Sequence, residues 1–211
     1  MLKKNIYFPI NLALLSSALY VAFQLFANVL STKIALLPLV NLSVDGGTVI
    51  YPLTFTLRDF VHKTWGKKNA RQVVVIAGLL NFVMVGLFWL VAKMTPDPSW
   101  PNQAAYEAIL LPVGRIVAAS VAAQIISELI DTEIFSLVYK KINDVAAAFV
   151  SNFISLIIDS LLFGLLAFAG ALPLGVVAEI IMANILIKLV MSLGSAPAIA
   201  LIPRRVDFDD I

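Results

Sequence analysis

Residues 48–71 read TVIYPLTFTLRDFVHKTWGKKNAR, an apolar run that contains Arg58 and Asp59 and ends in a basic cluster. An ionised side chain at membrane depth costs several kcal/mol unless it faces a polar cavity or an opposite charge. Arg58 and Asp59 are therefore expected to face the inside of a helix bundle. There they support a functional site or a gate, or form a structural ion pair. The basic cluster marks the cytoplasmic end of this segment.

The composition around this stretch is that of a membrane protein. The 211 residues are 61% hydrophobic and 13% charged, whereas a soluble domain has about a quarter of its residues charged. The net charge of +2 is small and its cations gather at a few sites, which argues against a nucleic-acid surface. Cysteine is absent and His62 is the single histidine, so thiol catalysis and Cys/His metal sites are excluded. We expect a protein that is not an enzyme and uses no metal or other cofactor.

Six apolar runs are long enough to cross the roughly 30 Å hydrocarbon core of a bilayer. They predict helices at about residues 10–32, 48–65, 73–93, 109–131, 146–170 and 176–202. The second is the weakest, because its apolar part ends at Arg58, and it can be short, tilted or re-entrant. Residues 34–40 either continue the first helix or lie at the interface, although Pro38 disfavours an unbroken helix. Residues 1–211 are thus expected to form one compact, all-α domain of six helices.

The distribution of lysine and arginine predicts the topology. With six spans, ten of the 15 basic residues fall on one side of the membrane, and Lys33 and Lys93 fall on the other. The positive-inside rule then places both termini in the cytoplasm of a bacterial or archaeal cell, with the protein in its inner membrane.

Three of the predicted helices carry polar stripes at helical spacing. The stripe of the fourth helix is Ser120, Gln124, Ser127 and Asp131, with Glu128 beside it. The stripes of the fifth and sixth helices are Asn152, Ser155 and Asp159, and Asn184, Lys188 and Ser195. Because exposure of polar side chains to lipid is costly, these stripes are expected to converge on a cavity. Arg115 points about half a turn away and is expected to support the structure or a gate by reaching toward the outer surface.

Each of these residues also has a purely structural interpretation. Asp159 and Lys188 can form an ion pair that only holds helices together. Asparagine side chains such as Asn152 and Asn184 often join helices in the same way. The glycines Gly78, Gly86 and Gly164 are expected to let helices approach closely.

Four blocks of the sequence carry family motifs in a fixed order. Residues 51–71 have an aromatic-proline start, then Asp59, then a basic tail, and residues 115–131 open with Arg and close with Asp. Residues 151–168 include Asp159-Ser160, and residues 188–197 run from a lysine to a proline. Together they resemble the queuosine precursor transporter family, also called the vitamin uptake transporter-like family. The resemblance implies a six-helix carrier for the 7-cyano and 7-aminomethyl 7-deazaguanines from which queuosine in tRNA is made.

This substrate class suggests roles for the polar residues. A deazaguanine presents N1–H and a 2-amino group side by side, and one carboxylate can accept both. The candidates for that carboxylate are Asp59, Asp131 and Asp159. The candidate donors to the carbonyl edge are Asn152, Gln124 and Lys188, and those for stacking on the ring are Phe55, Phe163 and Tyr51. The rest of the expected substrate-binding set is Glu128, Ser155 and Asn184.

Three positions depart from the family pattern. Lys63 stands where many members have Glu, Glu128 where they have Gln, and Leu156 where they have an amide. A negative charge at Glu128 predicts a preference for the cationic aminomethyl base over the cyano base.

The main interpretation is a self-sufficient secondary carrier that exposes a mid-membrane site to each side in turn. The alternatives are a carrier of another purine-like base and the substrate-binding subunit of an ATP-driven vitamin importer, which needs an ATPase partner. A weaker alternative is an intramembrane aspartyl protease that uses two of the three candidate aspartates. The expected partners are the small-molecule substrate and the lipid bilayer, and a homo-oligomer is compatible with the sequence.

Overall fold

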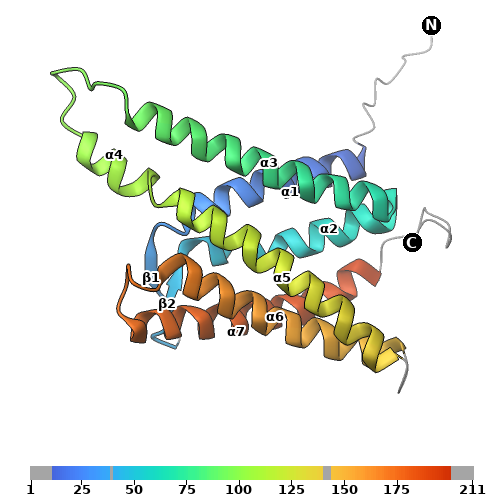
Figure 1. The fold of residues 1–211 in the computed structure, drawn as a ribbon. Coiled ribbons are helices and arrows are strands. Elements are labelled where there is room, and N and C mark those ends of the chain that lie inside the picture. Colours follow the sequence, from blue (N-terminus) through green and yellow to red (C-terminus); the bar gives the residue numbers. More distant parts are fainter. Residues whose placement is uncertain (1–10, 39, 140–143, 201–211) are drawn as a thin grey trace, which may run out of the picture.

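The computed structural model of the protein describes residues 11–38, 40–139 and 144–200. The elements in chain order are α1 (Leu12–Leu30), β1 (Ile34–Leu36), β2 (Ser43–Asp45), the 3-10 helix η1 (Gly46–Val49), α2 (Tyr51–Trp65), α3 (Lys67–Ala92), α4 (Gln103–Leu110), α5 (Val113–Tyr139), α6 (Asp144–Phe168) and α7 (Leu174–Ala200). The long helices run back and forth between two ends of the molecule (Figure 1). We call the end with β1, β2 and α4 the hairpin end, and the end where α2 passes into α3 the junction end.

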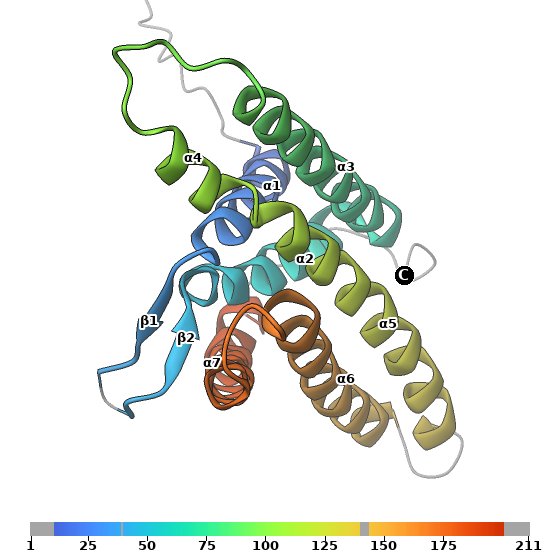
Figure 2. The same cartoon turned by 60° about the vertical axis from the view of Figure 1, so that its left-hand side comes forward.

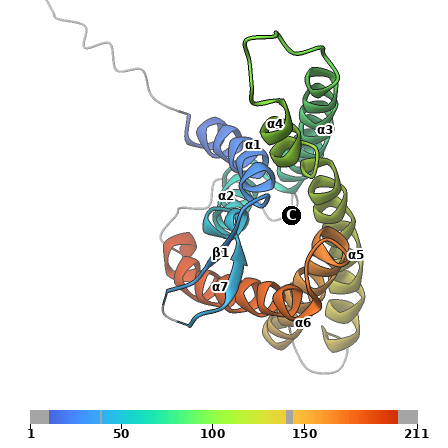
Figure 3. The same ribbon diagram turned by 90° about the vertical axis from the view of Figure 1, so that its left-hand side faces the viewer.

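The helices form two groups in chain order (Figure 2). In the first group α1, α2 and α3 contact one another, and in the second α6 packs against α5 and α7. Contacts of α2 with α7, and of α1 and α3 with α5, join the two groups. Figure 3 shows this arrangement from the hairpin end, with α5, α6 and α7 along one side and α1, α2 and α3 along the other.

The exposure of side chains is the reverse of that in a soluble protein. On α3, large apolar side chains such as Phe82 and Leu90 are exposed, whereas Asn81 is buried. Segments long and apolar enough to cross a membrane are Leu12–Leu30, Lys68–Ala92, Gln103–Asp131, Val150–Phe168 and Leu174–Met191. An apolar exterior around a polar interior is stable in lipid and unstable in water. The fold is thus that of a mostly helical, multi-pass membrane protein.

Three predicted spans correspond closely to helices of the structure. The spans predicted at residues 10–32, 146–170 and 176–202 correspond to α1, α6 and α7. The third span, predicted from residue 73, is longer, because α3 already begins at Lys67. The basic cluster is therefore not confined to a loop, because part of it forms the first turn of α3. Lysine and arginine are good helix formers, so they are compatible with this position.

The span predicted at residues 109–131 is interrupted. Helix α4 ends at Leu110 and α5 begins at Val113. Pro112 lies between them, and a proline cannot donate the hydrogen bond that an unbroken helix needs at this position. Helix α5 then continues to Tyr139, well past the predicted end.

Residues 34–38 do not continue α1, so the helical alternative for residues 34–40 was wrong, and the interfacial alternative stays a prediction. Strand β1 pairs with β2 in antiparallel register, with Ile34 opposite Asp45 and Leu36 opposite Ser43. Pro38 stands in the connection, and Asn41 adopts a positive φ of 50°, so the chain turns back on itself. The all-α prediction is therefore incomplete by one short hairpin.

Helix α2 is the weakly predicted second span, and it is short. Its 15 residues extend about 22 Å, less than the roughly 30 Å of a hydrocarbon core. The six-span count and the cytoplasmic position of both termini stay predictions. A single residue, Gly66, joins α2 to α3 with a φ of 87°, which a residue with a side chain rarely adopts.

Close packing of α6 on α7 depends on Gly164. A Cβ atom at this position would lie 2.3 Å from Cγ1 of Ile181, so the predicted role of Gly164 is confirmed. The same prediction is wrong for Gly78 and Gly86 on α3, because a Cβ atom there would meet nothing within 4 Å.

Candidate functional site

A polar pocket lies where the two groups of helices meet. The space free of protein atoms within it and at its open mouth is about 340 Å³. The residues that line it are Ala27, Asn28, Ser31, Asp45, Gly47, Thr48, Tyr51, Ser120, Asp159, Phe163, Asn184 and Lys188. Each half of the chain thus contributes about half of the wall.

The most buried ion pair of the pocket joins α6 to α7. Lys188 Nζ donates to Asp159 Oδ2 at 2.6 Å and to Ser160 Oγ at 3.1 Å. The Lys188 side chain is 3% exposed and that of Asp159 is 12% exposed. Because each charge has lost its water, breaking the pair by removing one partner would leave the other charge buried and uncompensated.

Aromatic rings flank this ion pair. Lys188 Nζ lies 5.3 Å from the centroid of the Tyr51 ring, a cation–π distance. Tyr51 in turn meets Phe55 edge to face, with ring centroids 5.4 Å apart. Phe163 lines the pocket from α6, so Tyr51 and Phe163 contribute aromatic surface to it, while Phe55 contacts Tyr51 and is not among the lining residues.

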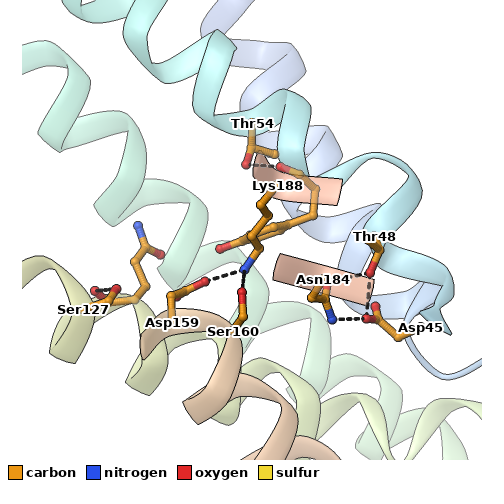
Figure 4. Close-up of polar contacts among 10 residues, drawn as sticks. Asp45, Thr48, Thr54, Ser127, Asp159, Ser160, Asn184 and Lys188 are labelled. Atoms are coloured by element: carbon orange, nitrogen blue, oxygen red, sulfur yellow. Dashed lines mark hydrogen bonds and ion pairs between the residues drawn. The ribbon is translucent and has the colours of Figure 1, made fainter. Parts of the chain in front are cut away.

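A second buried cluster surrounds Asp45, which the sequence analysis did not identify. Its Oδ1 accepts from Ser31 Oγ at 2.6 Å, and its Oδ2 accepts from Thr48 Oγ1 at 2.8 Å and from Asn184 Nδ2 at 2.9 Å. Asp45 is 2% exposed. Figure 4 shows the two clusters side by side, one around Asp45 and Asn184 and the other around Asp159 and Lys188.

Two glycines bring Asp45 into this position. A Cβ atom at Gly47 would lie 2.1 Å from Ser31 Oγ and 2.5 Å from the Ala27 carbonyl oxygen, so the backbone passes directly against the end of α1. At Gly46 a Cβ atom would lie 2.5 Å from the Leu30 carbonyl oxygen. An aspartate followed by two glycines, directly before the apolar run, is the sequence signal that would have indicated a close backbone approach.

The hairpin is also fastened to α7. The Ser43 amide donates to Glu179 Oε2 at 3.0 Å. Together with the hydrogen bond from Asn184 to Asp45, this contact holds β2 against one face of α7. Part of the pocket wall, formed by Asp45, Gly47 and Thr48, thus comes from a segment that lies between α1 and α2 in the chain.

Four of the predicted site residues gather outside the pocket, between α2 and α5. Arg58 Nη1 lies 3.4 Å from Glu128 Oε1, and Arg58 Nε lies 3.7 Å from Asp59 Oδ1. Gln124 Nε2 donates to Glu128 Oε1 at 3.3 Å. None of these four residues lines the pocket described above. We call them the Arg58 cluster.

The remaining predicted residues of the helix stripes lie in other places. Ser155 Oγ donates to Asp131 Oδ1 at 3.0 Å and so joins α5 to α6. Asn152 is exposed. Ser195 belongs to the part of α7 whose side chains the structure does not describe.

Arg115 caps a helix. Its Nε donates to the Leu166 carbonyl oxygen at 2.8 Å, and its Nη2 donates to the Ala169 carbonyl oxygen. The last carbonyl groups of a helix have no partners within the helix, and a cation there is favourable. Arg115 therefore stabilises the end of α6.

Comparisons with known proteins identify the family. Residues 45–202 match the family described as "Putative vitamin uptake transporter". The curated protein "Probable queuosine precursor transporter" of Bacillus subtilis (strain 168) is 28% identical over 167 residues, which cover 75% of this chain and 71% of that protein. No solved structure matches the chain. With its apolar membrane-spanning helices, the chain belongs to the vitamin uptake transporter family and is a multi-pass membrane transport protein.

Proposed function

We propose that this protein imports 7-deazaguanine precursors of queuosine, the 7-cyano base, the 7-aminomethyl base or both. It does so across the inner membrane of a bacterial or archaeal cell, with both termini in the cytoplasm. The observation that carries the proposal is the pocket, in which buried carboxylates, an ammonium group and an amide stand beside aromatic rings.

The chemistry of the pocket suits a flat, polar base. Deazaguanines have adjacent N–H donors, a carbonyl acceptor and an aromatic face. Asp45 and Asp159 offer acceptors, Asn184 and Lys188 offer donors, and the ring of Tyr51 offers a stacking surface. A ligand that left these groups unpaired would be disfavoured, because buried polar groups without partners are costly.

The position of the pocket supports a carrier mechanism. It lies between the α1–α3 group and the α5–α7 group, so rocking one group against the other would expose the same site to each side in turn. In this mechanism the chain acts alone, without an ATPase partner.

The charges of the pocket support a preference for the cationic aminomethyl base. The described lining contains two carboxylates, Asp45 and Asp159, and one ammonium group, that of Lys188. The formal charge is therefore −1, which favours a cationic ligand. Support for this preference thus comes from the pocket rather than from Glu128, which contacts Arg58 outside it.

Thermal stabilisation of the purified protein tests the substrate class. A ligand that binds only the folded state at 100 times its Kd stabilises the protein by about 2.7 kcal/mol. We expect stabilisation by both deazaguanines, more by the aminomethyl base, and none by vitamins such as riboflavin or biotin. A panel in which no deazaguanine stabilises the protein would sink the proposal.

Uptake into proteoliposomes that contain only this chain tests the mechanism. Accumulation of labelled deazaguanine without ATP is the expected result, and an absolute need for an ATPase would favour the ATP-driven importer instead. The Asp159→Asn variant serves as the site control, because unchanged binding and uptake in this variant would remove Asp159 from the site.

A further inference from the structure

Two carboxylates are buried at the pocket, and their surroundings differ. Asp159 already holds an ammonium group, that of Lys188, at 2.6 Å. Asp45 is surrounded by neutral donors only, two hydroxyl groups and one amide. Within the described part of the chain, no lysine or arginine forms an ion pair with Asp45.

We propose that Asp45, carried on the hairpin, is the carboxylate that reads the N1–H and 2-amino edge of the substrate. This assignment rests on the proposed function and replaces the aspartates that the sequence analysis considered for this role. It follows from the free-energy cost of displacing the present partners of each carboxylate. A ligand that uses Asp159 for this edge has to displace a buried lysine, whereas one that uses Asp45 has to displace only neutral donors.

The two hydroxyl donors of Asp45 each have a second acceptor within reach. Thr48 Oγ1 lies 2.8 Å from Asp45 Oδ2 and 2.7 Å from Asn184 Oδ1. Ser31 Oγ lies 2.6 Å from Asp45 Oδ1 and 2.9 Å from the Ala27 carbonyl oxygen. Because a hydroxyl group has one proton, it donates to one acceptor at a time. Both hydroxyl groups can therefore release Asp45 to a ligand and remain hydrogen-bonded.

Asn184 is placed to read the neighbouring part of the same edge. Its amide nitrogen lies 2.9 Å from Asp45 Oδ2. In a guanine-like base the carbonyl group follows directly after N1–H, so a ligand bound to Asp45 brings this oxygen beside the carboxylate. The Asn184 amide then donates to the carbonyl oxygen. The two carboxylate oxygens of Asp45 accept from N1–H and the 2-amino group, so every polar group along this edge of the base has a partner.

The test is a reversal of specificity in the Asp45→Asn variant. An asparagine accepts N1–H through its oxygen and donates through its nitrogen, so it matches a 2-oxo base and not a 2-amino base. The two probes are 7-cyano-7-deazaguanine and 7-cyano-7-deazaxanthine, measured by calorimetry on purified protein. Wild-type protein is expected to prefer the 2-amino base by about 100-fold, and Asp45→Asn to prefer the 2-oxo base by about 10-fold.

The matched control is Asp159→Asn, which removes the other buried carboxylate. It is expected to weaken both ligands and to keep the wild-type order. Reversal in Asp159→Asn, or the wild-type order in Asp45→Asn, overturns the assignment of Asp45. If wild-type protein binds neither 7-cyano-7-deazaguanine nor 7-aminomethyl-7-deazaguanine, the proposed function fails instead, so the two failures are distinguishable.

A second variant covers the case in which Asp45→Asn does not fold. Asp45→Glu keeps the charge and moves the carboxylate by one methylene group. The affinity ratio between 7-cyano-7-deazaguanine and its analogue without the 2-amino group is expected to fall at least about 10-fold relative to wild type. An unchanged ratio in a folded Asp45→Glu protein overturns the proposal.

Discussion

The pocket and the Arg58 cluster both contain ion pairs, but they differ in burial and in geometry. The pair in the pocket is 2.6 Å long, with side chains 3% and 12% exposed, whereas Arg58 and Glu128 are 3.4 Å apart and 35% and 54% exposed. Buried pairs are strongly coupled, because each partner needs the other, while exposed pairs contribute little. The comparison teaches that charge in this chain has two settings, a short, buried pair between α6 and α7 and a longer, more exposed pair between α2 and α5.

Removing the cation of the pocket is expected to have the largest effect on stability. Lys188→Met leaves the Asp159 carboxylate buried without its partner and should lower the free energy of unfolding by about 3–5 kcal/mol. Thermal unfolding in detergent measures the loss. The double variant Lys188→Met, Asp159→Asn should recover most of it, and simple additivity of the two changes would contradict the coupling.

Adding a methyl group at the base of the hairpin should have the next largest effect. Gly47→Ala places a Cβ atom 2.1 Å from Ser31 Oγ and 2.5 Å from a backbone oxygen of α1. Overpacking of this kind costs about 1–3 kcal/mol and should also weaken ligand binding, because Asp45 moves with the hairpin. Gly86→Ala is the matched control, since its Cβ atom meets nothing within 4 Å, and equal losses in the two variants would count against the close approach.

A buried amide pair at the wall of the pocket gives a smaller expected effect. Asn28 Nδ2 donates to Asn81 Oδ1 at 2.7 Å and joins α1 to α3. Asn81→Leu should lower stability by about 1–2 kcal/mol, since interhelical hydrogen bonds in membranes contribute modestly. A double-mutant cycle with Asn28→Leu measures the coupling, and a value of zero would show that the pair holds nothing together.

The smallest effect is expected in the Arg58 cluster. Arg58→Gln should change stability by less than about 1 kcal/mol, because its contacts with Glu128 and Asp59, at 3.4 and 3.7 Å, are longer and less buried than the ion pair in the pocket. The measurement is again thermal unfolding, now at low and high salt. A loss as large as that of Lys188→Met would erase the distinction between the two regions and place Arg58 in a dry environment.

The long helices could be predicted because an apolar run of sufficient length has few other stable structures in a membrane. The hairpin could not, because strands of three residues carry too little alternation to stand out from a loop. The break between α4 and α5 had a signal in Pro112, but the apolar run continues through it. Length and hydropathy thus determine the spans, while local turns depend on contacts that lie far apart in the sequence.

The site was predictable only where it lies on regular helices. Asp159, Asn184 and Lys188 stand at helical spacing and do meet in the pocket. On α5 the stripe continues for several turns from Ser120 toward the junction end, but the pocket is shorter than the stripe, so Gln124 lies beyond its wall. Asp45 was missed because its segment carries no periodicity, and only the fold of the hairpin brings it inward.

The single-residue connection at Gly66 allows α2 to rotate as a rigid helix about its end next to α3. One intervening residue keeps the end of α2 within about 7 Å of the start of α3 in every conformation. A rotation of the 15-residue helix by about 10° about this fulcrum would sweep its far end through about 4 Å. That far end carries Tyr51, so a small tilt at the basic end of the molecule would displace a ring in the wall of the pocket by about the thickness of an aromatic ring.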